Sequence, residues 1–432
     1  MILEFSIANT YCIKELQTVS FETALTNNVD DDLHVCVMPD GKKLLKIACV
    51  YGANASGKSK LLVALRDYLN FMLHSFQNIK PDAPTGHVPF LFDETCRNSP
   101  GFFSITFYHV PEGSLTNEPR RFVYELSMDA HKVFKESLVY YPKSQKKLIF
   151  NRIGTHVKWG DMIKGTKKQI SQMIRDNVSL ISGAANLNQT FMASIHKVLS
   201  GLLPEPLITP DRYYDIFTAM SVDAIEKRNV ISVLKAADFH DISDITMKEF
   251  DFSTQLETQM SHDVVEELKK NGVNMKQWDV SVTHTFEGHA MELPLDEESE
   301  GTQRFLETMV PLILSCNIPK LLRIDEIESS LHIELIEFFI RSFLHNCNDS
   351  QLLFTTHILD LMDSKLLRDD EIWIARKKED GACEYTSITD YTGLRKDVSR
   401  KYYYEAGKFG GYPLTDGYFS LKGCMNAKKN KK

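Results

Sequence analysis

The chain has 432 residues, of which 43% are hydrophobic and 25% are charged. This is the composition of a globular protein with ample apolar material for a core, and the length predicts two to three compact units. The formal net charge of -8 and the sequence pI near 6.0 give no overall attraction to a polyanion. Composition therefore neither implies contact with DNA nor excludes it.

Strands and one long helix are predicted in the first part of the chain. Residues 1–8 and 18–22 alternate apolar and polar side chains, and 44–51 form an apolar run that ends at Gly52. From Lys58 to about Asn78, apolar residues recur at spacings of three and four, which predicts one apolar stripe on a helix. The order is strand, glycine-rich turn, helix.

Two-residue periodicity returns between residues 102 and 152. Four runs predict an antiparallel meander attached to the sheet that carries the glycine-rich turn; they lie at 103–107, 122–128, 133–141 and 148–152. Residues from about 160 to 240 carry helical patterns instead, which predicts a helical insertion. From about residue 244 the strand patterns return.

The C-terminal part alternates helices and strands. The expected elements are helix 302–316, strand 320–325, helix 331–346, strand 351–356 and strand 371–376. This alternation predicts a parallel α/β arrangement, so the expected fold class is α/β with a mixed sheet and an antiparallel lobe. We divide the chain into a first part of the main domain at 1–155, the insertion at 156–242, a second part at 243–392, and a helical extension with a basic tail at 393–432.

The cysteines show no local grouping. They lie at positions 12, 36, 49, 96, 316, 347, 383 and 424, without a CxxC pair. This pattern indicates neither a zinc site nor a disulfide framework, and a reducing cytosol fits it best. The first residues lack an export signal, and no apolar stretch reaches the ~18 residues of a membrane helix. We therefore expect a cytoplasmic protein without a membrane segment.

The glycine-rich turn, GANASGKS at residues 52–59, matches G-x-x-x-x-G-K-[ST] in full and lies between a predicted strand and a predicted helix. Gly52 and Gly57 let the backbone wrap closely, Lys58 reaches the β and γ groups of a bound nucleotide, and Ser59 holds Mg²⁺. The residues that we expect to contact the nucleotide here are Asn54, Ala55, Ser56, Gly57, Lys58 and Ser59.

A second chemical motif ends the strand predicted at 320–325. Asp325 would coordinate Mg²⁺ beside Ser59, and Glu326 would polarise the attacking water as general base. Arg323 departs from the otherwise apolar pattern of this strand. Taken alone, an Asp-Glu pair is usually a helix start or a surface feature, so the assignment depends on the motifs around it.

Two further elements flank this acidic pair at informative distances. Ser299 and Gly301 lead directly into the predicted helix 302–316, and His357 follows the predicted strand 351–356. Ser299 could simply cap the helix, and a lone histidine at a strand end is usually structural. Together with the P-loop, however, the order of the serine–glycine loop, the acidic pair and the histidine favours a role for all three in nucleotide binding and hydrolysis.

The set GANASGKS, SEGTQR, IDEIESSLH and TTH resembles the ABC-type AAA ATPases of bacterial phage-defence systems, which include the OLD family, the AbiL type and the AriA component of PARIS systems. SEGT in place of the transporter LSGGQ is the discriminating detail. The resemblance spans nearly the whole chain and implies a P-loop NTPase fold of the ABC type that uses ATP and Mg²⁺.

This resemblance also implies roles for residues beyond the P-loop. Ser299 and Gly301 would meet the γ-phosphate held by a second copy of the chain, so a homodimer or higher homo-oligomer is expected, and His357 would contact the γ-phosphate of its own subunit. Asn9 would lie in an N-terminal motif near the nucleotide, and residues 328–332 would communicate across the dimer. The sequence departs from the family in having Asn9-Thr10-Tyr11-Cys12 where Asn-Phe-Arg-Ser is usual, and in lacking an evident glutamine loop.

The first functional hypothesis is a defence ATPase that senses infection, with a phage protein among its triggers, and controls a separate effector such as a Toprim nuclease. A nuclease within this chain is disfavoured, because only 75 residues follow His357. The alternative is a DNA-repair ATPase like RecF or SMC; the insertion is too short for a long coiled-coil arm but leaves room for a short one. A transporter ATPase is disfavoured by the SEGT loop.

Overall fold

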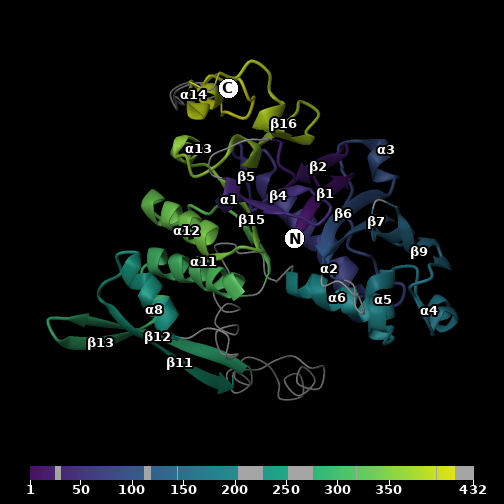
Figure 1. The fold of residues 1–432 in the computed structure, drawn as a ribbon, viewed down its shortest axis with the longest axis horizontal. Helices are drawn as coiled ribbons and strands as arrows, with labels where there is room; N and C mark the ends of the chain where they lie inside the picture. Colours follow the sequence, from purple (N-terminus) through teal and green to yellow (C-terminus); the bar gives the residue numbers. More distant parts are fainter. Residues whose placement is uncertain are drawn as a thin grey trace, which may run out of the picture.

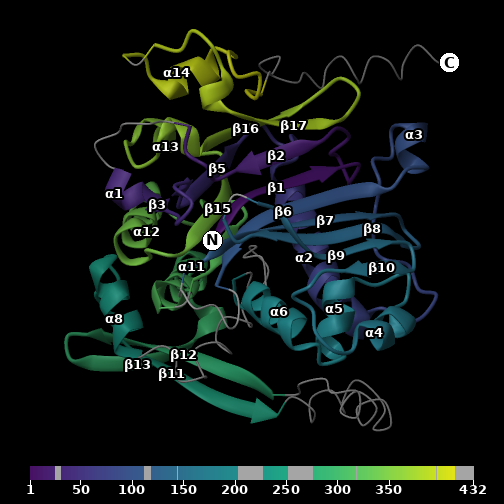
Figure 2. The same ribbon diagram turned by 45° about the vertical axis from the view of Figure 1, so that its right-hand side comes forward.

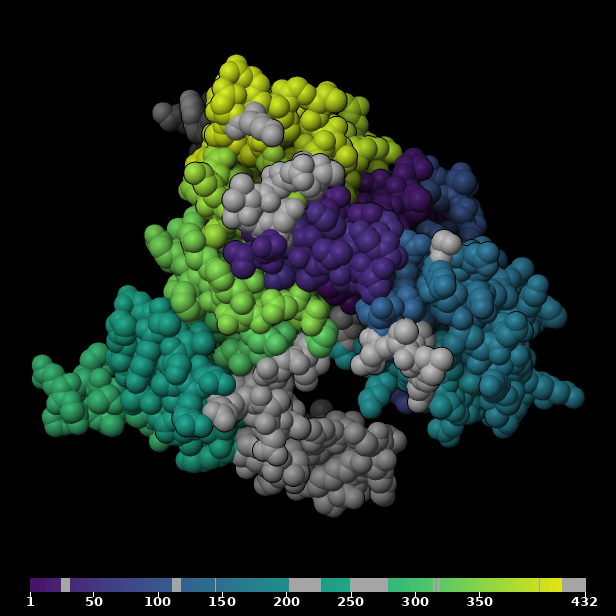
Figure 3. All heavy atoms as spheres, viewed as in Figure 1, coloured from purple at the N-terminus to yellow at the C-terminus, as the bar shows by residue number. Residues whose placement is uncertain are grey.

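The computed structural model describes residues 1–24, 31–110, 118–143, 145–202, 227–251, 276–317, 319–395 and 397–413. The predicted basic tail and Cys424 lie outside these ranges. Two large sheets with a long helix between them form the centre of the molecule (Figure 1). In the space-filling view, the N-terminal residues lie between the C-terminal residues above and the antiparallel lobe at the right (Figure 3).

A five-stranded sheet carries the sequence motifs. Its order is β14-β15-β5-β16-β17, in which the first four strands are parallel and β17 is antiparallel to β16. The strands are β5 (Ile47–Tyr51), β14 (Leu321–Ile324), β15 (Gln351–Thr356), β16 (Ile372–Lys377) and β17 (Cys383–Ser387). Every residue of β5, β14 and β15 is buried, because both faces of the sheet are covered. The predicted parallel α/β arrangement is confirmed.

Helices on both faces explain that burial. On one face, helix α2 (Lys58–Asn78) packs against Ala48 and Val50. On the other face, α11 (Glu300–Asn317) and α12 (Ile333–Asn346) pack against Ile47, Cys49 and Tyr51 of the same strand. The predicted helices therefore form, with boundaries shifted by one or two residues.

The seven-stranded antiparallel sheet lies on the far side of α2 (Figure 2). Its order is β10-β9-β8-β7-β6-β1-β2, so the predicted meander forms and continues onto β1. The strands are β1 (Ile2–Ala8), β2 (Gln17–Ser20), β6 (Gly101–His109), β7 (Arg120–Met128), β8 (Val133–Tyr141), β9 (Lys147–Ile153) and β10 (His156–Trp159). Strand β10 lies inside the range predicted as a helical insertion; none of its four residues is buried, so it lacks the apolar alternation that marks a strand.

The predicted insertion contains three helices, α4 (Lys167–Met173), α5 (Leu180–Asn186) and α6 (Thr190–Leu202). Helices α5 and α6 pack beside α2, and α4 packs against β10. The carboxylate of Glu136, in β8, holds the start of α5, because it accepts hydrogen bonds from the Leu180 amide at 2.8 Å and the Ser179 hydroxyl at 2.9 Å. Arg152 pairs with Glu136 at 3.3 Å, and both side chains are fully buried. A carboxylate at a helix N-terminus is stabilised by the helix dipole and the free amides.

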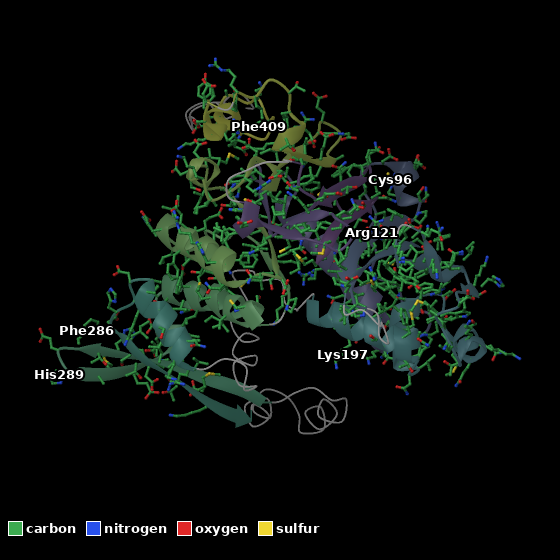
Figure 4. The ribbon with its side chains drawn as sticks, in the orientation of Figure 1. Cys96, Arg121, Lys197, Phe286, His289 and Phe409 are labelled. Carbon is green, nitrogen blue, oxygen red and sulfur yellow. The ribbon has the colours of Figure 1, made fainter. Side chains whose placement is uncertain are left out.

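A three-stranded sheet projects below α11, on the side of α11 away from α12 (Figure 1). It consists of β11 (Ile242–Asp251), β12 (Lys276–Phe286) and β13 (His289–Pro294), with α8 (Lys227–Ala236) against it. Phe286 and His289 lie at the outer end of the β12–β13 hairpin (Figure 4). Strand β13 was not predicted, because four of its six residues are exposed and the strand offers no apolar face.

The C-terminal extension caps the five-stranded sheet. Helix α14 (Arg400–Glu405) covers part of the helix predicted there, and the backbone then turns at Gly407 and Gly410, which have φ of 73° and 71°. Phe409 packs its ring against Tyr391 and Tyr403 at centroid distances of 5.0 and 6.2 Å (Figure 4). No helix within the described ranges is long and apolar enough to cross a membrane.

The remaining elements are short. They are α1 (Asp31–His34), β3 (Val35–Val37), β4 (Lys43–Leu45), α3 (Glu94–Arg97), the 3₁₀ turns Leu295–Glu297, Asp369–Glu371 and Ile388–Asp390, and α13 (Asp360–Asp363).

Candidate active site

The loop of residues 52–59 connects β5 to α2 and is packed too tightly for side chains at its two glycines. A Cβ atom on Gly52 would lie 2.5 Å from the Ala375 carbonyl oxygen. A Cβ atom on Gly57 would lie 2.5 Å from the Cys383 sulfur, and Gly57 also has a φ of 101°, which strongly favours glycine. Ala375 of β16 and Cys383 of β17 therefore pack directly against the two glycines and fix the shape of this loop.

Lys58 is buried within this loop, with 5% of its surface exposed. Its ammonium donates hydrogen bonds to the carbonyl oxygens of Gly52 at 2.8 Å and Ala53 at 3.1 Å. Burial lowers the pKa of Lys58, and the carboxylates of Glu328, Glu326 and Asp325 oppose that shift. The acidic residues after β14 are thus close enough to the P-loop lysine to interact with its charge.

The strand order explains how this approach arises. Strand β15 lies between β14 and β5, so Asp325 follows a strand two positions away from the one that leads into the P-loop. At about 4.8 Å per strand, that separation is about 10 Å, which leaves room for phosphate groups and a metal ion between the two loops. Parallel strands place both loops at the same edge of the sheet.

Asp325 and Glu326 differ in their surroundings. The Asp325 side chain is nearly buried and accepts a hydrogen bond from the Thr355 hydroxyl at 2.6 Å. The same hydroxyl accepts from the Glu326 amide at 2.8 Å. Glu326 itself has a φ of 49° and an exposed side chain, so the chain turns sharply at the end of β14. One carboxylate is held in place by a hydrogen bond, and the next is open to solvent.

Arg304, in the first turns of α11, supports this acidic pair from behind. Its guanidinium donates to the carbonyl oxygens of Asp325 at 3.0 Å and Glu326 at 3.2 Å. The side chain is buried and also pairs with Glu307 at 3.3 Å. Sequence reasoning missed this role; the only signal was its position just after Gly301 in the SEGTQR motif. Arg304 links the helix that begins at Ser299 to the acidic loop.

The buried Glu307 makes stability depend on pH. Burial raises the pKa of its carboxyl group from 4.5 to about 7, although Arg304 opposes the shift. Between these two pKa values the folded chain retains a proton that the unfolded chain releases. The contribution of Glu307 to the free energy of unfolding is therefore most favourable below pH 4.5, and it is lost as the pH rises through about 7. Glutamine does not titrate, so the free energy of unfolding of Glu307→Gln should rise by about 2 kcal/mol relative to that of the wild type as the pH increases from 5 to 8, which urea unfolding would measure. Parallel pH profiles for the two proteins would contradict this prediction.

Ser299 and Gly301 lie at the start of α11. The Ser299 hydroxyl accepts from the Thr302 amide at 3.1 Å, so the serine does cap the helix. A Cβ atom on Gly301 would lie 3.1 Å from the Ser330 carbonyl oxygen, and the Ser330 hydroxyl donates to Glu300 at 3.1 Å. The start of α11 thus packs against the 328–332 loop of the same chain, while the side chain of Ser299 remains exposed.

His357 follows β15, and its imidazole is exposed. Its backbone amide donates to a Glu328 carboxylate oxygen at 2.6 Å. Glu328 also interacts with Lys58, so it connects the histidine loop to the P-loop. Sequence reasoning placed Glu328 only in the inter-subunit loop and did not foresee this contact, which depends on the folding of two distant segments.

Asn9 is occupied by structural hydrogen bonds. Its amide nitrogen donates to the carbonyl oxygens of Cys96 at 2.8 Å and Ser99 at 2.9 Å, and its side-chain oxygen accepts from the Phe90 amide at 3.0 Å. The neighbouring Tyr11 donates to Asp67, and the ammonium of Lys60 lies 5.1 Å from the centre of the Tyr11 ring. Thr10 and Tyr11 of this motif thus contact the P-loop helix, because the Thr10 hydroxyl also forms a hydrogen bond with the Tyr68 hydroxyl at 2.8 Å.

The donor set fits a magnesium-bound triphosphate. Mg²⁺ prefers oxygen ligands and is usually held by one or two carboxylates together with substrate phosphates and water. The Ser59 hydroxyl and the Asp325 carboxylate, the two Mg²⁺ ligands predicted from the sequence, are oxygen donors of this kind. Within the described ranges, no group of three or more His, Cys, Asp and Glu residues is arranged to hold a metal ion.

Comparisons with known proteins agree with this fold. A family model described as an AAA domain, putative AbiEii toxin, Type IV TA system, matches residues 195–363. That range includes Ser299, Asp325, Glu326 and His357 but not the loop at 52–59. No curated protein matches the sequence. The predicted fold class, an α/β P-loop NTPase with a mixed sheet, is confirmed, and the family match supports an ATPase of the AAA or ABC type.

Three of the solved structures that match over most of the chain are heads of SMC proteins. The SMC head domain from Thermotoga maritima matches with a TM-score of 0.42 and 10% identity, over 89% of this chain and 98% of that chain. An SmcHead bound to the C-winged helix domain of ScpA matches with a TM-score of 0.41 and 11% identity, over 89% of this chain and 96% of that chain. The third structure is an Smc head domain with an extended coiled coil, bound to the C-terminal domain of ScpA derived from Pyrococcus furiosus. It matches with a TM-score of 0.37 and 11% identity, over 89% of this chain and 95% of that chain.

Proposed function

We propose that this chain binds ATP with Mg²⁺ at residues 52–59 and hydrolyses it. The observation that carries the proposal is the approach of three carboxylates to Lys58, in a loop whose glycines leave no room for side chains. A buried ammonium beside acidic groups, at the N-terminus of a long helix, is suited to the charges of a triphosphate and its metal ion. Amides at that helix N-terminus add further donors.

The residues divide the chemistry among them. Lys58 exchanges its hydrogen bonds to the Gly52 and Ala53 carbonyls for hydrogen bonds to phosphate oxygens. Ser59 and Asp325 would hold Mg²⁺, which when bound would supply positive charge beside the phosphates. Glu326 accepts a proton from the attacking water. His357 donates a hydrogen bond to the terminal phosphate from the end of β15.

A second copy of the chain completes the site in this proposal. Ser299 and Gly301 lie at the N-terminus of an 18-residue helix, where free amides and the helix dipole favour an anion. The Ser299 side chain is exposed, so it is accessible to the phosphate bound by another subunit. ATP would then join two subunits, and hydrolysis would release them.

A mixing experiment tests this shared site. Ser299→Asp keeps an N-cap residue but places a negative charge against the γ-phosphate, so we expect it to be inactive although it folds. Lys58→Ala is inactive for a different reason. Mixed in equal amounts, the two variants should regain roughly a quarter of wild-type phosphate release, because half of random dimers are mixed and each mixed dimer has one intact site. Full activity of Ser299→Asp alone would show that the serine serves only as a cap.

For the biological role, we propose the sensor or scaffold subunit of a bacterial anti-phage system that controls a separate effector, such as a Toprim nuclease. The motif set supports this role, and so does the family description, which names a putative toxin of a toxin–antitoxin system. A cytoplasmic location follows, because both ATP and phage products are present there. Nucleotide state would set the assembly, and the assembly would hold or release the effector.

Phage plating tests the biological role. We would express the chain in a bacterial host with and without the genes beside its own, and compare plaque numbers with those of the Lys58→Ala variant. Protection that requires both Lys58 and a neighbouring gene supports the proposal. Equal plating under all conditions, or a transporter permease as the neighbour, would contradict it.

A further inference from the structure

Two cysteines that are far apart in the sequence meet beneath the P-loop. Cys12 lies in the turn after β1, and Cys383 is the first residue of β17. The Cys383 amide donates to the Cys12 carbonyl oxygen at 2.7 Å. The side chains are close enough to interact, because the Cys383 thiol lowers the pKa of Cys12 and the Cys12 thiol raises the pKa of Cys383. This backbone hydrogen bond makes the two residues direct neighbours in space, and residues joined in this way have Cα atoms roughly 5 to 6 Å apart, within the range that a disulfide spans.

Cys383 directly supports the shape of the P-loop. A Cβ atom on Gly57 would lie only 2.5 Å from its sulfur, so the thiol packs against the glycine. Two residues further along β17, the Tyr385 hydroxyl donates to the Gly57 carbonyl oxygen at 2.8 Å. The Cys383 side chain is buried, with 3% exposure. Any rearrangement of this sulfur is therefore transmitted to the loop that begins α2.

Cys12 is the reactive member of this pair. It is partly exposed, whereas Cys383 is not. The Cys383 thiol, together with the charge of Lys60, lowers the pKa of Cys12 to about 7 despite its partial burial. Burial raises the pKa of Cys36, Cys49 and Cys96 instead. Because the thiolate is the reactive form, Cys12 favours attack on an oxidant.

We propose that Cys12 and Cys383 form an oxidation site at which a peroxide switches off ATP binding. The Cys12 thiolate attacks a peroxide oxygen and becomes a sulfenic acid, and the O–O bond breaks. The Cys383 thiol then attacks the Cys12 sulfur, forms the S–S bond and displaces water. In total, two thiols and one hydrogen peroxide give one disulfide and two waters, and the two electrons pass from the sulfurs to the peroxide.

The effect on ATP follows from the packing around Gly57. A disulfide brings the sulfurs to about 2.05 Å and requires a dihedral angle near 90°, so at least one side chain must rotate. The Cys383 sulfur is packed tightly against Gly57, so its rotation changes the packing that supports the P-loop. The reaction is reversible by thiols, as expected of a regulatory disulfide in a reducing compartment.

A second thiol pair provides a matched control. Cys316, in α11, and Cys347, after α12, have their sulfurs 3.1 Å apart. They also can be oxidised to a disulfide, and the pKa of Cys316 is lowered by the Cys347 thiol. Cys347 belongs to the core on the α11 and α12 side of the sheet, not to the core that contains Cys383. Oxidation of this second pair should leave Gly57 undisturbed.

The test treats the full-length wild type, Cys12→Ser and the double variant C316S/C347S with hydrogen peroxide. Disulfides are identified by mass spectrometry after alkylation and digestion, and ATP affinity is measured by calorimetry before and after dithiothreitol. We expect a Cys12–Cys383 cross-link in the wild type and the double variant, with a loss of ATP affinity of at least about tenfold that dithiothreitol reverses. Cys12→Ser should keep its affinity, and Cys12→Ala serves if the serine variant has a lowered melting temperature.

Two results would overturn the inference: no Cys12–Cys383 cross-link, or a cross-link with unchanged ATP affinity. The effect on affinity rests on the proposed ATP site at residues 52–59, but the cross-link does not. If the reduced wild type fails to bind ATP, the proposed function fails on its own, and mass spectrometry still decides whether the two thiols react.

Discussion

Replacing Lys58 with alanine is expected to abolish ATP binding and hydrolysis. The ammonium is the one lysine charge inside the P-loop, and it interacts with the carboxylates of Asp325, Glu326 and Glu328. Without it, the triphosphate would approach three acidic groups with no compensating side-chain charge from the loop. We expect ATP affinity to fall at least about a hundredfold, which calorimetry with a non-hydrolysable ATP analogue would measure.

The control must separate a lost ligand contact from a lost fold. Lys58 also donates to the carbonyl oxygens of Gly52 and Ala53, so its removal leaves these acceptors to water. Lys197→Ala removes an exposed lysine on α6, outside the P-loop, and should leave affinity unchanged (Figure 4). Wild-type ATP affinity and turnover in Lys58→Ala, with a normal melting temperature, would refute the assignment of this loop.

The sequence predicted the parts of the fold that have local periodicity. The strand–loop–helix unit around Lys58 could be predicted because its motif is contiguous and the flanking burial patterns are regular. The meander from β6 to β9 could be predicted because most of its strands bury one face and expose or half-bury the other. Strands β10 and β13 bury no residue, and they were missed for that reason.

The candidate site was predictable only where chemistry and order along the chain coincide. Asp325 and Glu326 end a recognisable buried strand, so their positions at the sheet edge could be anticipated. The contacts of Arg304 and Glu328 could not, because they join segments separated in sequence and give no local pattern. The cysteines show the same limit: scattered positions did not indicate that Cys12 would meet Cys383, or Cys316 would meet Cys347.

Glu326→Gln should retain ATP but lose hydrolysis, and so trap an ATP-bound oligomer. Glutamine keeps the size of the side chain but cannot accept a proton from water, and loss of a general base costs about 10² to 10⁴ in rate. It also removes a negative charge close to the terminal phosphate. The Asp325 carboxylate keeps its hydrogen bond from Thr355, so the proposed Mg²⁺ ligand stays in place.

Two measurements distinguish trapping from inactivation. Single-turnover phosphate release should fall at least about a hundredfold, while light scattering after gel filtration with ATP should show the oligomer accumulating. Glu337→Gln, which removes one member of an exposed pair with Arg341 on α12, should behave as the wild type. If Glu326→Gln still turned over ATP at the wild-type rate, another group would be the base. Glu328 would then be the first candidate, because it also interacts with Lys58, and Glu328→Gln should abolish the remaining hydrolysis.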